Sequence, residues 1–312
     1  MSGEAGAARR VLLLFVDGVG LTEHDPATNP LAVARLPALS RLLATDRPLT
    51  GGACSGPHAS LLGLDACLGV PGLPQSGTGQ AALLTGENTA RAFGRHFGPW
   101  TPTALRPLVA ERSVLARARA AGRGVAFANA YPEELMRVPS DAPRLPLPLR
   151  AGPVIAARGA GALTRHTPEL MRGDAVASEI VNDGWRDKLR RDVPQVTAEG
   201  AGRTLARIAA AHDLTLYAHY ATDSVGHERD LARGVAIAER LDAFLGAVVD
   251  AMSDDTLLIV ASDHGNLEDV REQHTLNPAL CLVAGAGRES VAGRLASIMD
   301  IAPAILGALG VD

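Results

Sequence analysis

The sequence predicts an α/β fold, in which a mostly parallel sheet is flanked by helices and carries a small inserted cap. Three continuous apolar runs support this prediction: residues 11–16, 214–220 and 256–261. Such runs are typical of parallel strands that are buried on both faces. Helical patterns at 201–212 and 231–251 precede the second and third runs, and strands that alternate with helices indicate a parallel sheet.

The middle of the chain predicts the cap. Residues 113–121 have a helical pattern and residues 124–130 are typical of a further core strand, but the alternation ends at Tyr131. Prolines then cluster between 139 and 153, which is typical of an insertion or lid. We therefore expect a discontinuous core of residues 1–130 and 196–312, with a cap of residues 131–195. The alternative is that residues 131–195 form a long surface segment without a function.

The composition is that of a globular protein, since 47% of the 312 residues are hydrophobic and 21% are charged. A net charge of −4 gives no electrostatic reason to expect a nucleic-acid or membrane partner. The 3 cysteines form no CxxC pair, which favours reduced thiols in the cytoplasm. The apolar run at 11–16 is too short for the core of a signal peptide or for a membrane span.

Acidic residues and histidines follow the predicted strands. An aspartate comes after each apolar run, and ligands of open α/β sheets gather beyond the carboxyl ends of the strands. Residues four apart share a helix face, so an aspartate and a histidine at this spacing can bind one ion. Taken singly, each residue is more often a helix cap or a surface residue; together they suit two divalent ions. The candidates are Asp17, Asp223, His227, Asp263, His264 and His274.

A glycine-rich turn at residues 73–80 leads into a helical stretch at 81–84. Such a turn at a helix N-terminus suits an oxyanion, but it is not a P-loop because no Gly-Lys-Ser/Thr follows. Ser76 or Thr78 could cap the helix, which is the default interpretation. Beside two metal ions, either hydroxyl could instead serve as a nucleophile. The residues alone do not choose between the two.

Six segments occur in a fixed order along the chain: FVDGVG at 15–20, QSGTGQ at 75–80, TDSVGH at 222–227, SDHGNLE at 262–268, HTLNP at 274–278 and DIAP at 300–303. This ordered set resembles the alkaline phosphatase superfamily, in particular the branch that contains cofactor-independent phosphoglycerate mutase and phosphopentomutase. The resemblance implies an alkaline phosphatase-like core and a metal-dependent enzyme that transfers phosphoryl groups.

The resemblance also implies roles for individual residues. It favours Ser76 over Thr78 as the nucleophile. It implies two divalent cations, manganese or zinc, since aspartate and histidine ligands accept either metal. Two ligand sets follow: Asp17, Ser76, Asp263 and His264 for one ion, and Asp223, His227 and His274 for the other.

The chain departs from the mutases in two ways. Gln80 stands where the mutases usually carry histidine, and the large insert that phosphoglycerate mutase places after its nucleophile is missing. We therefore expect a phosphomonoesterase that acts on a small phosphorylated substrate through phosphoserine. The alternatives are a phosphosugar or phosphoglycerate mutase and a non-catalytic, metal-binding member of the family. A sulfatase is disfavoured because the chain has no Cys/Ser-x-Pro-x-Arg motif. The sequence does not indicate an oligomeric state.

Several further residues are candidate substrate contacts, although a surface role is equally compatible with the sequence for most of them. Thr78 and Gln80 lie in the glycine-rich turn and the helix that follows it. The others lie after that helix or in the expected cap: Arg95, His96, Arg137, Arg144, Arg158, Arg165 and His166.

Overall fold

The computed structural model describes residues 10–50, 52–139, 142 and 144–311. Its centre is a seven-stranded sheet with the order β2-β3-β7-β6-β1-β5-β4. The strands are β1 (Arg10–Val16), β2 (Cys54–Ser55), β3 (Ala59–Leu64), β4 (Val125–Phe127), β5 (Leu214–His219), β6 (Thr256–Ala261) and β7 (Ala279–Gly285).

The central strands are parallel. β1 pairs in parallel with both β5 and β6, and β4 pairs in parallel with β5. β7 is antiparallel to β6 and to β3, so β3 runs in the same direction as the central strands. The predicted α/β fold with a mostly parallel sheet is thereby confirmed, and the three predicted runs are β1, β5 and β6. The sequence analysis did not identify β2, β3 or β7.

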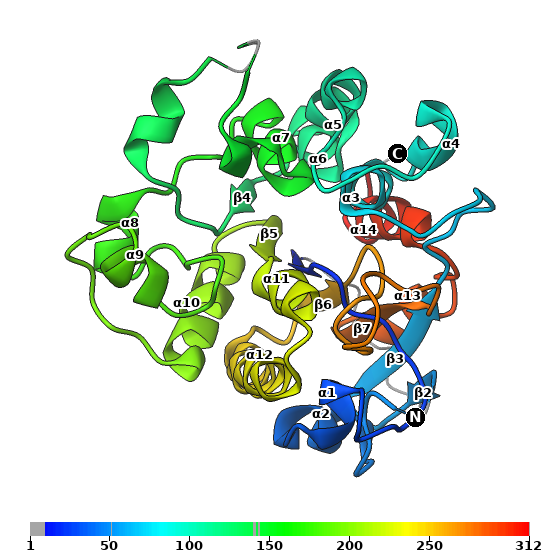
Figure 1. Ribbon diagram of the computed structural model, residues 1–312. Coiled ribbons are helices and arrows are strands. Elements are labelled where there is room, and N and C mark those ends of the chain that lie inside the picture. Colours follow the sequence, from blue (N-terminus) through cyan, green and yellow to red (C-terminus); the bar gives the residue numbers. More distant parts are fainter. Residues whose placement is uncertain (1–9, 51, 140–141, 143, 312) are drawn as a thin grey trace, which may run out of the picture.

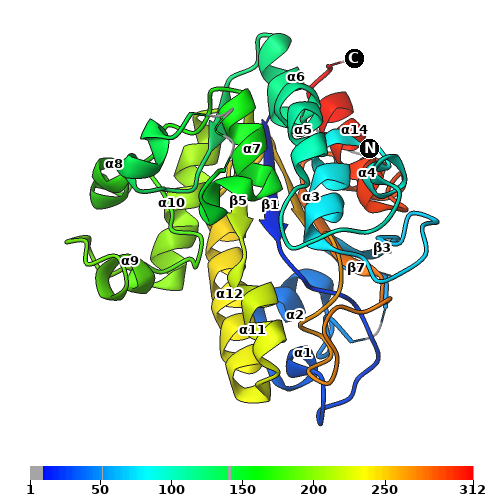
Figure 2. The ribbon, with the colours of Figure 1, turned by 45° about the horizontal axis from the view of Figure 1, so that its top comes forward.

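Helices cover both faces of the sheet (Figures 1 and 2). One layer contains α3 (Ser76–Thr85), α5 (Arg106–Arg112), α6 (Val114–Ala120), α7 (Gly152–Gly159) and α14 (Ile301–Ala308). The other contains α1 (Pro30–Val33), α2 (Pro37–Leu43), α10 (Ala198–Ala210) and α12 (Leu231–Ala251). Alternate residues of β1 enter the two cores: Val11, Leu13 and Phe15 pack in the first, Leu12, Leu14 and Val16 in the second. Burial on both faces explains why β1 is a continuous apolar run.

The remaining elements are short. They are α4 (Thr89–Phe93), α8 (Thr167–Arg172), α9 (Asp183–Asp187), α11 (Ala221–Glu228) and α13 (Arg288–Ala292), with 3-10 helices at Thr103–Leu105, Glu133–Arg137, Leu147–Arg150 and Ile298–Asp300. Within the described ranges, no helix has both the length and the apolar character that a membrane span requires.

The segment expected to form the cap has two kinds of packing. α7 packs against α3, α5 and α6, and its residues Val154 and Ala156 belong to a main core. Around α8 and α9, a separate small cluster forms from Ala130, Leu170, Ala175, Ala177, Trp185 and Val193. α7 is thus built into the first helix layer, whereas the rest has an apolar cluster of its own. The division of the chain into core and cap stays a prediction.

Candidate metal centre

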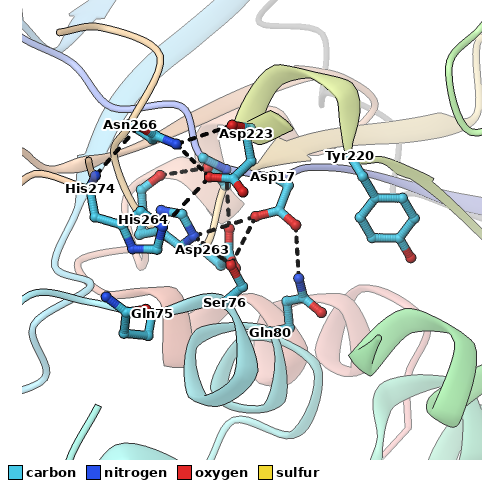
Figure 3. Close-up of polar contacts among 12 residues, drawn as sticks. Asp17, Gln75, Ser76, Gln80, Tyr220, Asp223, Asp263, His264, Asn266 and His274 are labelled. Atoms are coloured by element: carbon cyan, nitrogen blue, oxygen red, sulfur yellow. Dashed lines mark hydrogen bonds and ion pairs between the residues drawn. The ribbon is translucent and has the colours of Figure 1, made fainter. Parts of the chain in front are cut away.

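The candidate site lies at the carboxyl edge of three adjacent strands. β1 lies between β5 and β6, and Asp17 directly follows β1. Asp263 follows β6 after one intervening serine, and α11, which carries Asp223, begins just beyond β5. Figure 3 shows the three aspartates converging from these separate segments. The convergence expected from the strand order is therefore present in the structure.

Ser76 is the first residue of α3 and is 3% exposed. Its Oγ lies 2.9 Å from His264 Nε2 and 3.4 Å from Asp17 Oδ1. His264 Nε2 lies in turn 3.4 Å from Asp17 Oδ1 and 3.7 Å from Asp263 Oδ2. The four side chains predicted to share one ion thus point toward a common space (Figure 3).

The second predicted ligand set also comes together. Asp223 and His227 lie one turn apart on α11, with 3.3 Å between Asp223 Oδ2 and His227 Nε2. His274 Nε2 lies 3.3 Å from His227 Nε2 and 3.7 Å from Asp223 Oδ1. The i, i+4 spacing therefore places both side chains on one face, as expected for residues of one helical turn.

Asp223 lies between the two groups. Ligand atoms of Asp223, His227 and His274 lie within 4.8 Å of one another, and so do those of Asp17, Asp223 and His264. The sequence analysis assigned Asp223 to the second set alone. Its position beside both groups means that two ions held here would be close neighbours. The individual roles of these residues stay predictions.

Two histidines are oriented by their second ring nitrogen. His274 Nδ1 is hydrogen-bonded to the carbonyl of Pro74 at 2.7 Å, and His264 Nδ1 lies 3.2 Å from the carbonyl of Gly265. These contacts leave Nε2 of each ring directed into the cluster. Outer hydrogen bonds of this kind fix the tautomer and the orientation of metal-binding imidazoles. His274 also has a φ of 53°, a strained backbone conformation that is enriched at functional sites.

The electrostatics of the cluster favour a cation. Burial raises the pKa of Asp263 well above its usual range, and the charge of Asp17 adds to the effect. Burial also raises the pKa of Asp17. Burial opposes protonation of His264, but Asp263 and Asp17 outweigh it and raise the pKa of that imidazole to about 10. The closely spaced carboxylates therefore create a negative potential that attracts positive charge.

The donor set fits divalent cations. Asp263 Oδ2 is buried and has no hydrogen-bond partner among the described residues. The ion-pair partners of Asp17, Asp223 and Asp263 within the described ranges are histidines, with no arginine or lysine. Buried carboxylates without fixed cations are costly unless an ion binds them. Carboxylate oxygens with imidazole nitrogens suit manganese or zinc.

Two glycines let α3 approach the cluster. A Cβ on Gly77 would lie 2.2 Å from the carbonyl oxygen of Trp100, and a Cβ on Gly79 would lie 3.0 Å from that of Asp263. Glycine at both positions therefore allows the first turn of α3 to pack against the 97–100 loop and the loop after β6. This close packing is the structural reason for the Ser-Gly-Thr-Gly pattern.

Sequence reasoning gave no role to Asn266 or Glu268. Asn266 Nδ2 donates to Asp223 Oδ1 at 2.7 Å. The fully buried carboxylate of Glu268 accepts from the backbone N–H of Gly20 at 2.7 Å and from Asn277 Nδ2 at 3.1 Å. It also accepts from the Thr275 hydroxyl. Glu268 thus joins the loops that carry Asp17, Asp263 and His274. Both residues lie in the SDHGNLE segment, in which the sequence analysis assigned roles only to Asp263 and His264. The other residues of this segment were the feature of the sequence that could have indicated further functional residues.

Thr78 and Gln80 have structural partners. The Thr78 hydroxyl accepts from the backbone N–H of Phe97 at 3.2 Å, so it does not face the cluster. The Gln80 amide donates to Asp17 Oδ2 at 2.9 Å and accepts from the backbone N–H of Gly152 at 2.9 Å. Neither Ser76 nor Thr78 caps α3, because its N-cap is Gln75 and has no side-chain cap bond. The default capping interpretation is therefore wrong.

The other candidate contacts lie away from Ser76. Arg95 and His96 line an open groove with Pro71, Gly72, Leu73 and Gln75 rather than the cavity beside Ser76. Arg158 donates to the carbonyl of Val138, and Arg165 donates to those of Asp174 and Phe127. His166 Nδ1 is bonded to the carbonyl of Tyr131, while Arg137 and Arg144 are exposed. None of these side chains lines that cavity.

His219, at the end of β5, gives a pH-dependent prediction. Its Nδ1 bonds to the carbonyl of Ser178 at 2.7 Å, and burial lowers its pKa to about 4. The unfolded chain, with a histidine pKa near 6.5, binds this proton more tightly, so stability is lost as the pH falls from about 6.5 to 4. In urea unfolding of the chelated protein, His219→Gln should reduce the loss between pH 7 and 4.5 by roughly 2 kcal/mol. Equal losses in both proteins would contradict the prediction.

Comparison with known proteins agrees with this geometry. Residues 190–312, which contain five of the predicted ligands, match the Metalloenzyme superfamily. The matched residues make up less than half of the chain. The family resemblance read from the ordered motifs is thereby confirmed.

Curated relatives match part of this chain. A 2,3-bisphosphoglycerate-independent phosphoglycerate mutase from Desulforudis audaxviator is 32% identical over 128 residues, 38% of this chain and 25% of the mutase. The corresponding mutase from Cereibacter sphaeroides is 36% identical over 125 residues, 36% of this chain and 24% of the mutase. The match therefore spans about a quarter of each of these mutases.

Solved structures match almost the whole chain. An alkaline phosphatase from an Antarctic bacterium has a TM-score of 0.54 at 12% identity, covering 99% of this chain and 100% of its own. Thermus thermophilus alkaline phosphatase has a TM-score of 0.54 at 15% identity, covering 99% and 93%. A Pyrococcus horikoshii protein has a TM-score of 0.56 at 13% identity, covering 98% of each chain. These matches confirm the alkaline phosphatase-like fold.

Proposed function

We propose that this protein is a metal-dependent phosphomonoesterase in which Ser76 accepts the phosphoryl group. The observation that carries the proposal is the position of Ser76 Oγ. It lies 2.9 Å from His264 Nε2, among the side chains of the candidate metal centre, and it faces a cavity. A nucleophilic hydroxyl beside cation-binding side chains is the arrangement that phosphoryl transfer needs.

The residues of the chain have defined tasks in this reaction. The backbone N–H of Thr78 donates to the carbonyl of Phe97. We therefore assign the binding of an anionic group at Ser76 to the N–H groups of Ser76 and Gly77 in the first turn of α3. Ser76 Oγ forms a bond to phosphorus while the ester P–O bond breaks, and the alcohol leaves with a proton. Water then attacks the phosphoserine, which releases inorganic phosphate and restores the hydroxyl. Divalent ions bound at the centre would lower the pKa of the hydroxyl and offset charge on the phosphoryl oxygens.

A mutase is the second candidate, because the curated relatives that match part of the chain carry that name. A mutase must hold its dephosphorylated product while water is kept from the phosphoserine. In this chain the expected cap is short, and α7 is built into the first helix layer. Gln80 is also a neutral amide, which cannot exchange protons as histidine does. Both features favour hydrolysis.

The test uses protein reconstituted with manganese or zinc. It is incubated with 2- and 3-phosphoglycerate, pentose phosphates and a panel of monoesters, while free phosphate and isomerised product are both measured. We expect release of inorganic phosphate from at least one ester. Efficient interconversion of any substrate pair without phosphate release would show that the protein is a mutase rather than a phosphatase. If the loaded protein has neither activity, the non-catalytic alternative holds.

A further inference from the structure

A cavity of about 240 Å³ opens beside Ser76. Asp17, Ser76 and Asp223 form its metal-centre side, and the opposite walls include residues of the expected cap. Tyr220 lines this cavity, and Figure 3 shows Tyr220 on the opposite side of Asp17 from His274. An alcohol attached to a phosphoryl group at Ser76 would therefore extend into this space.

The walls of the cavity are rich in aromatic side chains. Trp100, Tyr131 and Tyr220 line it, together with Pro99 and Pro148. The whole chain has only 3 tyrosines and 2 tryptophans, and aromatic residues make up 3% of it. Three of the few large aromatic rings thus meet at this one cavity. Walls of this kind favour the burial of apolar or planar groups.

Within the described residues, no arginine, lysine or histidine lines the cavity. Its charged lining residues are Asp17 and Asp223, both of which belong to the candidate metal centre. Burial raises the pKa of both Tyr131 and Tyr220, so both phenols are neutral. Beyond the metal centre, the walls therefore offer no charge of either sign.

Tyr220 adds one polar group. Its hydroxyl is buried beside the phenol of Tyr131 and makes no hydrogen bond of good geometry within the described residues. A buried hydroxyl without a partner is costly, and a bound group that satisfies it recovers part of that cost. The walls thus combine aromatic surface with this hydroxyl and with the uncharged polar side chains of Gln80, Ser178 and Ser224.

We propose that this cavity selects phosphomonoesters whose alcohol part is small, uncharged and largely apolar, and that it rejects alcohol parts with a second anionic group. The inference rests on the proposed phosphomonoesterase function. A cavity of about 240 Å³ is smaller than the usual pockets for drug-sized ligands, which fits a small alcohol part. A carboxylate that extends from Ser76 into this space would lose part of its water and would meet no arginine, lysine or histidine on the walls.

The test compares pairs of esters in which one member carries a carboxylate that the other lacks. Phenyl phosphate is paired with 4-carboxyphenyl phosphate, and glycerol 3-phosphate is paired with 3-phosphoglycerate. We expect kcat/KM to be at least about tenfold higher for the member without the carboxylate in each pair. If no ester is hydrolysed, the proposed function fails. If esters are hydrolysed but the carboxylates react equally well or better, only the specificity inference fails.

A binding readout does not depend on turnover. Trp185 is 5% exposed and packs in the small apolar cluster, so Trp185→Phe leaves Trp100 as the remaining tryptophan. In this variant, phenylphosphonate should quench Trp100 fluorescence, and 4-carboxyphenylphosphonate should quench it only at about tenfold higher concentration. Equal quenching by both ligands, or quenching by neither, would overturn the inference.

A designed cation gives a gain-of-function test. Pro148 is exposed and lines the cavity, whereas its neighbour Leu147 is 53% exposed and does not line it. Pro148→Arg should reduce the ratio of kcat/KM for the ester without the carboxylate to kcat/KM for the ester with it. We expect a reduction of about threefold or more, because the arginine can pair with the carboxylate. Leu147→Arg is the matched control and should leave the preference unchanged. An equal effect of both variants would show that the cavity does not select by charge.

Discussion

Replacement of Ser76 by alanine is expected to lower kcat by about 10³-fold or more, because the group that accepts the phosphoryl is removed. The metal content should change little, since six other predicted ligands remain. Incubation with a ³²P-labelled ester followed by acid quench should trap label on the wild-type chain and none on Ser76→Ala. Label at the wild-type level on the variant would exclude Ser76 as the acceptor.

Thr78→Ala is the matched control for this substitution. Thr78 lies two residues further along α3 and is fully buried, but its hydroxyl bonds to the backbone of Phe97 rather than pointing into the cluster. The hydroxyl also donates to the carbonyl of Gln75, so its loss should cost stability of the order of 1 kcal/mol for each of two hydrogen bonds and should lower activity far less than Ser76→Ala. An inactive Thr78→Ala together with an active Ser76→Ala would reverse the assignment of the nucleophile.

Asp263→Asn is expected to have opposite effects on activity and on the stability of the metal-free protein. The amide is a poor ligand, so bound metal should fall from two equivalents toward one and kcat should fall by about 10²-fold or more. Burial and the charge of Asp17 raise the pKa of Asp263 in the folded chain. The carboxyl therefore stabilises the metal-free fold only at low pH, and this stability is lost as the pH rises above about 4.

At pH 7 the asparagine variant should consequently be more stable than the wild type in the presence of chelator, by about 1–3 kcal/mol. Denaturant unfolding of both chelated proteins and metal analysis of both loaded proteins measure these effects. Asp250→Asn is the control, because the side chain of Asp250 is 61% exposed and paired with Arg41 at the surface. A chelated Asp263→Asn that is less stable than the wild type would show that the carboxylates do not repel one another as proposed.

The sequence predicted the parts of the fold and site that depend on local pattern. The apolar runs identified the three central strands, and each was followed closely by an aspartate, so parallel topology alone placed Asp17 and Asp263 at one edge. The spacing of Asp223 and His227 placed both on one helical face. By contrast, β3 and β7 were missed. Their antiparallel pairing is non-local, and although Asp65 directly follows β3, Ser60 and Gly63 interrupt the apolar run of that strand.

The supporting contacts could not be predicted because both partners must be known. Glu268 is bound by Gly20, Asn277 and the Thr275 hydroxyl, which lie on two different loops. The aromatic walls of the cavity come from segments that are far apart along the chain, and no periodicity connects Trp100 with Tyr220. The arginines of the expected cap looked available for phosphate recognition. In the structure, Arg158 and Arg165 bond to backbone carbonyls instead.

The Gln80 amide connects the metal centre to α7, since it donates to Asp17 and accepts from Gly152. One side chain therefore needs to be a donor and an acceptor at once. A neutral imidazole can also do both, but it loses its acceptor when it takes up a proton in mildly acidic solution. A carboxylate would repel Asp17 until it became protonated. A carboxamide does not titrate and carries no charge. Gln80 can therefore connect Asp17 with Gly152 at acidic and at alkaline pH.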